Sequence, residues 1–294
     1  MSLLTSFLHV LLVCMVIFVI IYIVWRSIFQ CKGYHMKGIL YNSQELIVQC
    51  LKSGTSNTVI VMGNGWNVSV DRNSRITKHD PIFLIPKKEL ELLKEGKEDY
   101  NIITTYFPFE CSGIDNSAAE LAYFLNKYYY GYNIILLGHS KSAVQFAQML
   151  NYLNGRNLKL IFVSPAFGGV ISDEKVMSTL GILDRIMYRL IFVPHKVNED
   201  ITKGSFFLRE VADFSKISEH ESYLVRSKVW KKPFNIINNY LLHMDRKLGI
   251  LGDGIIGYEE QYCDVKWKRE FTVYASHSDS MAVAIQELED ISIL

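Results

Sequence analysis

The sequence of 294 residues has no CxxC pair and no cluster of cysteines with histidines, although it contains five cysteines. The spacing patterns of a structural zinc site are therefore missing, and we expect no metal. The cysteine count is odd and the positions are scattered, which fits reduced thiols better than a disulfide framework. The five are Cys14, Cys31, Cys50, Cys111 and Cys263.

An excess of charge of either sign is also missing. Lys and Arg number 31 and Asp and Glu number 30, so the formal net charge is +1. This balance gives no reason to expect nucleic acid as a partner. Internal repeats and low-complexity tracts are absent, and no domain boundary is visible within residues 38–294. We expect this part of the chain to form one domain with a sizeable core.

A long apolar run is present near the N-terminus. Residues 7–25, FLHVLLVCMVIFVIIYIVW, contain no Asp, Glu, Lys or Arg. As a helix they would span about 28 Å, close to the thickness of the hydrocarbon core of a bilayer. The competing interpretation is a cleaved signal peptide, which would need a basic n-region, a shorter apolar stretch and a small-residue cleavage site. None is evident, so we predict a transmembrane anchor over residues 7–28.

The flanking charge predicts the orientation of this single span. Arg26, Lys32 and Lys37 follow it, and no Lys or Arg precedes it. The positive-inside rule then predicts a membrane protein whose remaining chain lies in the cytoplasm. The sequon Asn67-Val68-Ser69 would argue for the opposite side, but it adjoins a loop that we assign to the active site below.

Apolar runs alternate with helical patterns after a predicted hairpin at 38–42 and 45–51. We predict buried strands at 57–63, 100–107, 132–138 and 158–166, and helices at 86–95, 115–130 and 141–155. Asp115 can cap the helix at 115–130, and Gly155 can end the helix at 141–155. This alternation predicts an α/β fold with a mostly parallel sheet flanked by helices.

The alternation breaks between residues 167 and 232. Helical patterns at 174–193 and 204–218 predict a helical insertion there, which could serve as a cap or lid. Strands are expected to resume at 233–240 and 270–276.

Ser140 lies where the predicted strand 132–138 meets the predicted helix 141–155. The arrangement strand, Gly138-His139-Ser140-Lys141-Ser142, helix is that of a nucleophile elbow, in which a serine is exposed on a tight turn. The helix would direct its N-terminal amides at the serine, and the Lys141 N–H would be one oxyanion donor. The alternative is a loop serine that only caps the helix.

A nucleophilic serine needs a base and an acid that orients the base. Among eight histidines, we choose His277 because it follows the last predicted strand and can reach over the elbow. For the acid we choose Asp253, which lies between two glycines; the alternative there is a plain Asp-Gly turn. Asp245 is the second choice, and Asp279 is better placed to cap the final helix.

The loop after the predicted strand 57–63 should provide the second oxyanion donor. Glycines at 63 and 65 allow a sharp backbone turn, and the Asn64 N–H is the expected donor. We further expect Gly65, Trp66 and His139 to contact the substrate.

In this order the segments resemble the α/β-hydrolase family, in particular its lipases and esterases. The matching segments are Met62-Gly63-Asn64-Gly65, Gly138-His139-Ser140-Lys141-Ser142, Gly252-Asp253-Gly254 and Ser276-His277-Ser278. GDGIIGYEEQ (252–261) is similar to the acid segment of bacterial-type lipases, and KGSFFLREV (203–211) also resembles a stretch found in some of these enzymes. Two positions depart from the pattern, since Met62 replaces a frequent histidine and Ser142 replaces the second elbow glycine.

The resemblance implies a serine hydrolase that cleaves carboxylic esters through a Ser-His-Asp triad and an acyl-enzyme, without a cofactor. The predicted anchor would keep the site near a membrane, where acyl esters are concentrated, so we expect lipid acyl esters as substrates. Three alternatives stay open, of which a purely structural membrane protein is disfavoured because only one span is present and the remaining chain has a globular pattern. The same triad serves thioesterases, acyltransferases and peptidases, and the fold can also be a catalytically silent binding or scaffold protein.

Overall fold

The structure is a computed structural model, and it describes most of the chain from residue 34 onward. The described residues are 34–63, 68–70, 75–79, 91, 93, 97, 99–108, 111–153, 158–182, 184–185, 199–229, 243, 246–249, 251–277 and 279–294. The expected anchor at 7–28, the strand at 233–240 and most of the helix at 86–95 lie outside them, so these stay predictions. Within the described residues, no helix is both long enough and apolar enough to cross a membrane.

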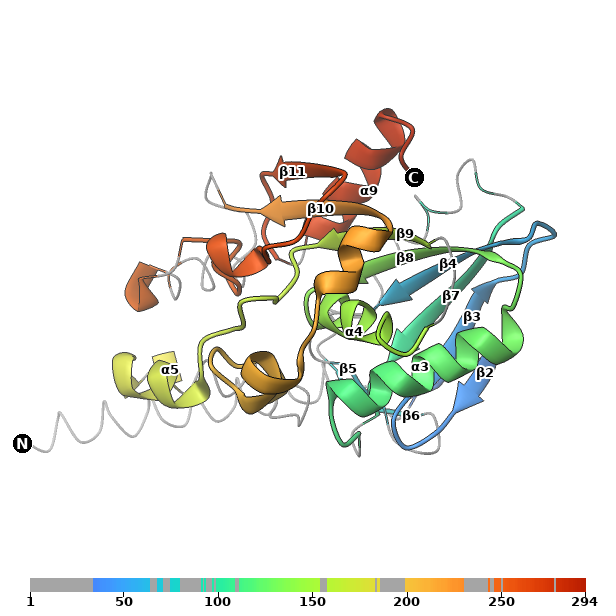
Figure 1. Cartoon of the computed structure of the whole chain (residues 1–294). Helices are drawn as coiled ribbons and strands as arrows, with labels where there is room; N and C mark the ends of the chain where they lie inside the picture. Colours follow the sequence, from blue (N-terminus) through green and yellow to red (C-terminus); the bar gives the residue numbers. More distant parts are fainter. Residues whose placement is uncertain are drawn as a thin grey trace, which may run out of the picture.

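An eight-stranded sheet forms the centre of the molecule (Figure 1). Its strand order is β11-β10-β9-β8-β4-β7-β3-β2. β3 runs antiparallel to both of its neighbours, and all other neighbouring strands are parallel. The strands are β2 (Ile39–Asn42), β3 (Ile47–Lys52), β4 (Thr58–Gly63), β7 (Asn101–Tyr106), β8 (Asn133–His139), β9 (Leu158–Val163), β10 (Glu221–Ser227) and β11 (Arg269–Val273).

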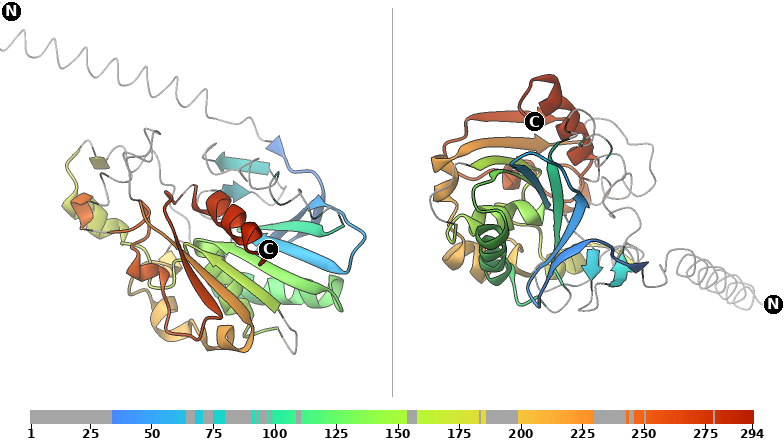
Figure 2. Two further views of the ribbon diagram at one scale, coloured as in Figure 1. Left: turned by 90° about the horizontal axis from the view of Figure 1, so that it is seen from above. Right: turned by 90° about the vertical axis from the view of Figure 1, so that its right-hand side faces the viewer.

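Helices cover both faces of this sheet. α3 (Ile114–Tyr128) and α4 (Lys141–Met149) lie on one face, and α9 (Ser280–Asp290) lies on the other (Figure 2). Shorter helices are α5 (Asp173–Thr179), the π-helical η1 (Phe207–Val211), and the 3-10 turns η2 (Ser215–Glu219) and η3 (Glu259–Gln261). A separate small sheet has the order β1-β6-β5, formed by Tyr34–His35, Arg75–His79 and Val68–Val70.

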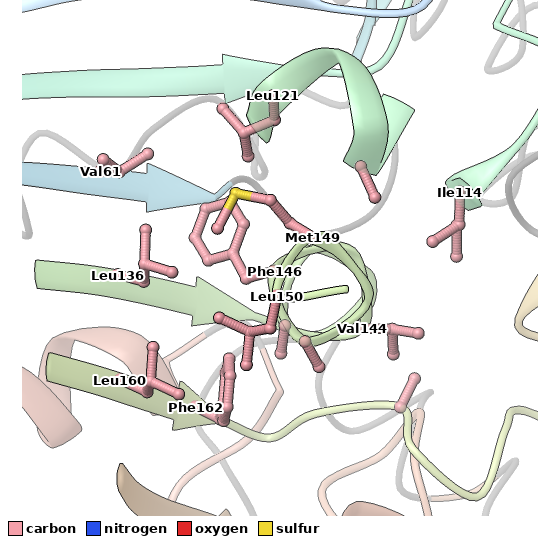
Figure 3. Packing of buried hydrophobic residues seen from close by; sticks show 14 of the residues in the cluster. Val61, Ile114, Leu121, Leu136, Val144, Phe146, Met149, Leu150, Leu160 and Phe162 are labelled. Atoms are coloured by element: carbon pink, nitrogen blue, oxygen red, sulfur yellow. The ribbon is translucent and has the colours of Figure 1, made fainter. Parts of the chain in front are cut away.

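Alternation along the strands divides the core into two apolar clusters. In β4, Val59 and Val61 face α3 and α4, whereas Ile60 and Met62 face α9. Successive side chains of a strand point to opposite faces, so a strand covered on both faces is apolar throughout. Figure 3 shows Phe146, Met149 and Leu150 of α4 directed at Val61, Leu136, Leu160 and Phe162 of the strands. The continuous apolar runs thus correctly predicted the buried parallel strands.

Most predicted elements are confirmed with small changes of boundary, but five predictions need correction. Residues 167–232 are not wholly helical, because β10 lies within that range and pairs with both β9 and β11. Its three consecutive apolar residues, Tyr223, Leu224 and Val225, are flanked by charge and are too few to indicate a strand by pattern alone.

The other corrections concern helices. α5 covers only the start of the predicted helix 174–193, because the backbone turns extended at Leu180. The segment 204–218 forms a π-helical turn and a 3-10 turn instead of one helix. α4 ends at Met149, before Gly155, which lies outside the described residues. Asp115 does not cap α3; the Asp200 carboxylate accepts the Ile114 N–H at 2.7 Å instead.

Candidate active site

Ser140 occupies a sharp turn between β8 and α4. Its backbone angles are φ 59° and ψ −125°, a region that residues other than glycine rarely adopt. Holding a serine there costs on the order of 1–3 kcal/mol, which the surrounding structure must offset. The Ser140 N–H donates to the Val163 carbonyl of β9 at 3.1 Å, which fixes the turn to the sheet. The predicted strand-turn-helix arrangement is therefore present at this serine.

The turn needs small residues around it, because β4, β8 and α4 approach one another closely. A Cβ on Gly138 would lie 2.7 Å from Ala143 Cα, and one on Gly63 would lie 2.4 Å from Ser142 Oγ. Ser142, the position that departs from the family pattern, fits without strain on the turn. Its hydroxyl donates to the His139 carbonyl at 2.7 Å and accepts the His139 N–H at 3.0 Å.

His277 and Asp253 form a buried pair. His277 Nδ1 lies 2.7 Å from Asp253 Oδ2, and the His277 N–H donates to the Asp253 carbonyl at 2.8 Å. The two side chains are 1% and 0% exposed. These two contacts hold the imidazole in one orientation and fix the proton on Nδ1, which leaves Nε2 as the basic nitrogen.

The Asp253 carboxylate is held by four further donors. Ser227 Oγ and Gln261 Nε2 donate to Oδ2 at 2.8 and 3.4 Å, and the Ile255 and Ile256 N–H groups donate to Oδ1 at 3.1 and 2.9 Å. Burial by itself raises the pKa of Asp253, but the interaction with His277 and these hydrogen bonds outweigh it and lower the pKa. The carboxylate is therefore charged at neutral pH.

The acid loop is attached to the end of β10 although the two are far apart in sequence. The Val229 N–H donates to the Gly252 carbonyl at 2.9 Å, which brings Asp253 to the carboxyl end of the sheet. Of the other two acid candidates, the structure describes only Asp279, which is not in this position. The Asp279 carboxylate accepts from Ser276 Oγ at 2.6 Å just before α9, and Asp245 lies outside the described residues.

His139 lies beside the base. The two imidazole rings are 4.6 Å apart between centroids and 32° from coplanar. The Ser280 hydroxyl donates to the His277 carbonyl at 3.0 Å, so at the 3.1 Å contact with His139 Nε2 it must be the acceptor. Burial, followed by the proximity of His277, lowers the pKa of His139 to about 3. His139 is thus a neutral ring packed against His277, and its contact with substrate stays a prediction.

The ring contact brings His277 to the residue that precedes Ser140. Within the described residues, His277 Nε2 has no hydrogen-bond partner, so the bond to Ser140 Oγ is not formed in this structure. Catalytic hydrogen bonds in unliganded sites are often long and become short only when substrate is bound.

Lys141 begins α4 directly after Ser140. As the first residue of the helix, it has an N–H without an intrahelical acceptor. Its side chain is 2% exposed, and burial lowers the pKa of its amine to about 8. The amine lies 5.1 Å from the centroid of the Phe107 ring.

The remaining predicted residues, Asn64, Gly65 and Trp66, lie outside the described part of the chain. Their loop starts beside the elbow, because Gly63 at the end of β4 is paired in register with Gly138. Their roles stay predictions. In the described part of the chain, no group of three His, Cys, Asp or Glu side chains could hold a metal ion.

Sequence reasoning missed three residues that support the base and the acid: Ser227, Gln261 and Ser280. They come from β10, η3 and the start of α9. No local pattern identifies them, because each acts only through a contact made in the folded chain.

Solved structures resemble this chain in fold. The crystal structure of lipase BlEst2 from Bacillus licheniformis in its mature form matches with a TM-score of 0.56 and 11% identity, over 85% of this chain and 99% of that one. The propeptide form of the same lipase matches with a TM-score of 0.55 and 12% identity, over 86% of this chain and 54% of that one. No protein-family model matches the sequence, and no curated protein matches it. The fold is the α/β-hydrolase fold.

Proposed function

We propose that this protein is a serine hydrolase that cleaves carboxylic esters, with Ser140 as nucleophile, His277 as general base and Asp253 as the acid that orients it. One observation carries the proposal. A serine held at φ 59° and ψ −125° between β8 and α4 lies at the sheet edge where an imidazole is fixed by a buried carboxylate. A serine that only capped the helix would need neither the unusual backbone nor the buried pair.

In the proposed reaction, Ser140 Oγ attacks the ester carbonyl carbon while His277 Nε2 takes the hydroxyl proton. The imidazolium then gives this proton to the departing alkoxide, which leaves as the alcohol and yields an acyl-enzyme. A water molecule repeats the sequence, with His277 again as the base, and releases the carboxylic acid. Asp253 stabilises the imidazolium and stays ionised throughout.

The oxyanion formed at each addition needs two donors. The Lys141 N–H, at the start of α4, and the Asn64 N–H, in the loop after β4, are the proposed pair. Losing one such donor typically costs about 3 kcal/mol in the barrier.

For the substrate we propose an acyl ester of a lipid, hydrolysed next to a membrane. The support is the apolar segment 7–28, which would hold the catalytic domain at the cytoplasmic side of a bilayer, where such esters are concentrated. The structural neighbour is a lipase, which agrees with this choice, although a fold can host many activities.

One observation favours a second candidate, a catalytically silent binding or scaffold protein. It is the lack, within the described residues, of a hydrogen bond to His277 Nε2. Labelling with a fluorophosphonate probe separates the two candidates. We expect labelling of the parent protein and of Ser142→Ala, and none of Ser140→Ala. A parent protein that stays unlabelled would support the silent alternative, and labelling that is lost only in Ser142→Ala would identify another nucleophile.

A panel of esters, thioesters and acyl acceptors then distinguishes the reactions that share this triad. We expect ester hydrolysis to be faster than thioester hydrolysis or acyl transfer.

A further inference from the structure

Lys141 is a buried cation for which the structure provides no counter-ion. Its side chain is 2% exposed, and in the described part of the chain its amine forms neither an ion pair nor a hydrogen bond. The neighbouring groups are the Phe107 ring and the Cys111 thiol. An ammonium group removed from water without an anionic partner is costly. Its presence directly after the nucleophile therefore needs an explanation.

The amine lies at the edge of the sheet that carries the site. Phe107 follows β7, whose carboxyl end lies beside that of β4, and β4 is paired in parallel with β8. The amine over Phe107 is therefore at the same edge as Ser140. The N-terminal amides of α4 add positive potential at this place.

The acidic groups described nearby are engaged elsewhere. Glu45 accepts from the Ser112 N–H and hydroxyl at 3.0 and 2.8 Å, and Asp200 accepts from the Ile114 N–H at 2.7 Å. Burial raises the pKa of the Cys111 thiol to about 12, so it stays neutral and provides no counter-charge.

A second polar side chain on the same helix also lacks a partner. Gln145 is 0% exposed, and in the described part of the chain neither its amide nitrogen nor its amide oxygen has a hydrogen-bond partner. Residues four apart lie on one face of a helix, so Gln145 is on the face of Lys141. Buried polar groups in native proteins nearly always have hydrogen-bond partners. Two buried polar side chains without partners on one helix face therefore suggest that a ligand binds there.

We propose that the Lys141 amine binds an anionic group, a phosphate or a carboxylate, on the substrate of the hydrolase. This rests on the proposed ester hydrolysis and narrows its substrate class to acyl esters that carry a negative charge close to the scissile carbonyl. The anion completes an ion pair with the buried amine, and it does so only when the ester is held beside Ser140.

Matched ester pairs test this proposal, because each pair differs in one charged group. The phosphate pair is 1-oleoylglycerol 3-phosphate and 1-oleoylglycerol, presented in neutral detergent micelles. The carboxylate pair is mono-4-nitrophenyl succinate and 4-nitrophenyl butanoate. The readout is the ratio of kcat/KM for the anionic ester to kcat/KM for the neutral one.

We expect a ratio above one for at least one pair, and the pair that shows it identifies the anion as phosphate or carboxylate. In Lys141→Met, which has a similar shape but no charge, the ratio should fall on the order of 10- to 100-fold, the range for a hydrogen bond to a charged group. Lys127→Met is the matched control. It removes a lysine from the surface of α3, where the amine lies over the Tyr123 and Tyr128 rings, and should leave the ratio unchanged.

A pH titration of the parent protein needs no variant and covers the case in which Lys141→Met does not fold. The amine is protonated below its pKa of about 8, so the ratio for the carboxylate pair should be high at pH 7 and fall at pH 9 and above. The Cys111 thiol stays neutral over this range.

The two proposals fail differently. If neutral esters are cleaved but neither pair shows anionic preference, or if folded Lys141→Met keeps the preference, the anion site is wrong and the hydrolase proposal stands. If no ester is cleaved and Ser140 is not labelled, both are wrong.

Discussion

At the scale of single residues, the pattern of the chain predicted that Asp253 and His277 would pair, but not what holds them in place. Ser140, Asp253 and His277 could be chosen because each follows a predicted strand or lies in a glycine turn, and parallel strands end at one edge. The donors to Asp253 could not be chosen, because Ser227 and Gln261 are ordinary polar residues in sequence. The ring contact of His139 with His277 could not be predicted either, since it depends on the position of α9.

The Asp253 carboxylate provides the first prediction at this scale. In Asp253→Asn the side chain keeps its volume, but His277 Nδ1 loses the acceptor that fixes its tautomer. We expect kcat for ester hydrolysis to fall on the order of 10⁴-fold, with little change in KM. Circular dichroism checks that the variant is folded. A loss of less than tenfold in a folded variant would mean that Asp253 is not the orienting acid.

His139 provides the second prediction. His139→Phe keeps a ring against His277 but removes the N–H that donates to Ser280. Loss of one supporting hydrogen bond of about 1 kcal/mol should lower kcat roughly fivefold and leave KM unchanged.

Ser280→Ala interrupts the same chain of contacts, so the double variant should be no worse than the more impaired single variant. A rise in KM with kcat unchanged would instead support the original expectation that His139 contacts substrate.

At the scale of elements, long apolar runs and glycine turns predicted most strands, but β10 and the helix ends were not predicted correctly. β10 is recognisable only in the folded chain, where β9 and β11 pair with its two edges and the two apolar clusters cover its faces. The start of α3 shows why caps are hard to predict. Asp115 has a residue type that caps helices, but α3 begins one residue before it, and its carboxylate accepts from Gln148 and Tyr152 at 2.6 and 2.5 Å. The group that caps α3 is Asp200, 86 residues away from Ile114.

This arrangement predicts that Asp200 stabilises α3 from a distance. Asp200→Ala leaves the Ile114 N–H without its acceptor and should lower the free energy of unfolding by about 1 kcal/mol. Asp200→Asn keeps an acceptor and should lose less. Urea denaturation measures both. Equal stability of Asp200→Ala and the parent protein would contradict a capping role.

At the scale of the whole molecule, the two apolar clusters position the segments that carry the proposed catalytic residues. The cluster under α4 positions the elbow, and the cluster under α9 positions the loop that carries His277. The alternation of strand and helix was sufficient to predict this layered arrangement, because apolar runs of this kind must be covered on both faces. Residues 186–198 and 230–232 of the predicted cap at 167–232 lie outside the described chain, and a role as a lid remains a prediction.

The dependence of stability on pH follows from the histidines buried in this arrangement. The pKa of His139 is lowered to about 3, and burial also lowers the pKa of His220. Below about pH 6.5 the unfolded chain binds protons that the folded chain does not, so stability must fall as the pH decreases from 6.5 towards 3. Each such histidine contributes a slope of up to about 1.4 kcal/mol per pH unit.

His139→Phe should therefore lose less stability than the parent protein between pH 7 and pH 5, although it is the less stable of the two at pH 7. The Asp253 pKa is also lowered, but its contribution is lost only below about pH 4, outside this window. Urea denaturation of both proteins at pH 7, 6 and 5 measures the difference. If the two proteins lost stability in parallel as the pH decreased, His139 would be protonated in the folded protein. The conclusion that a neutral His139 ring packs against His277 would then be wrong.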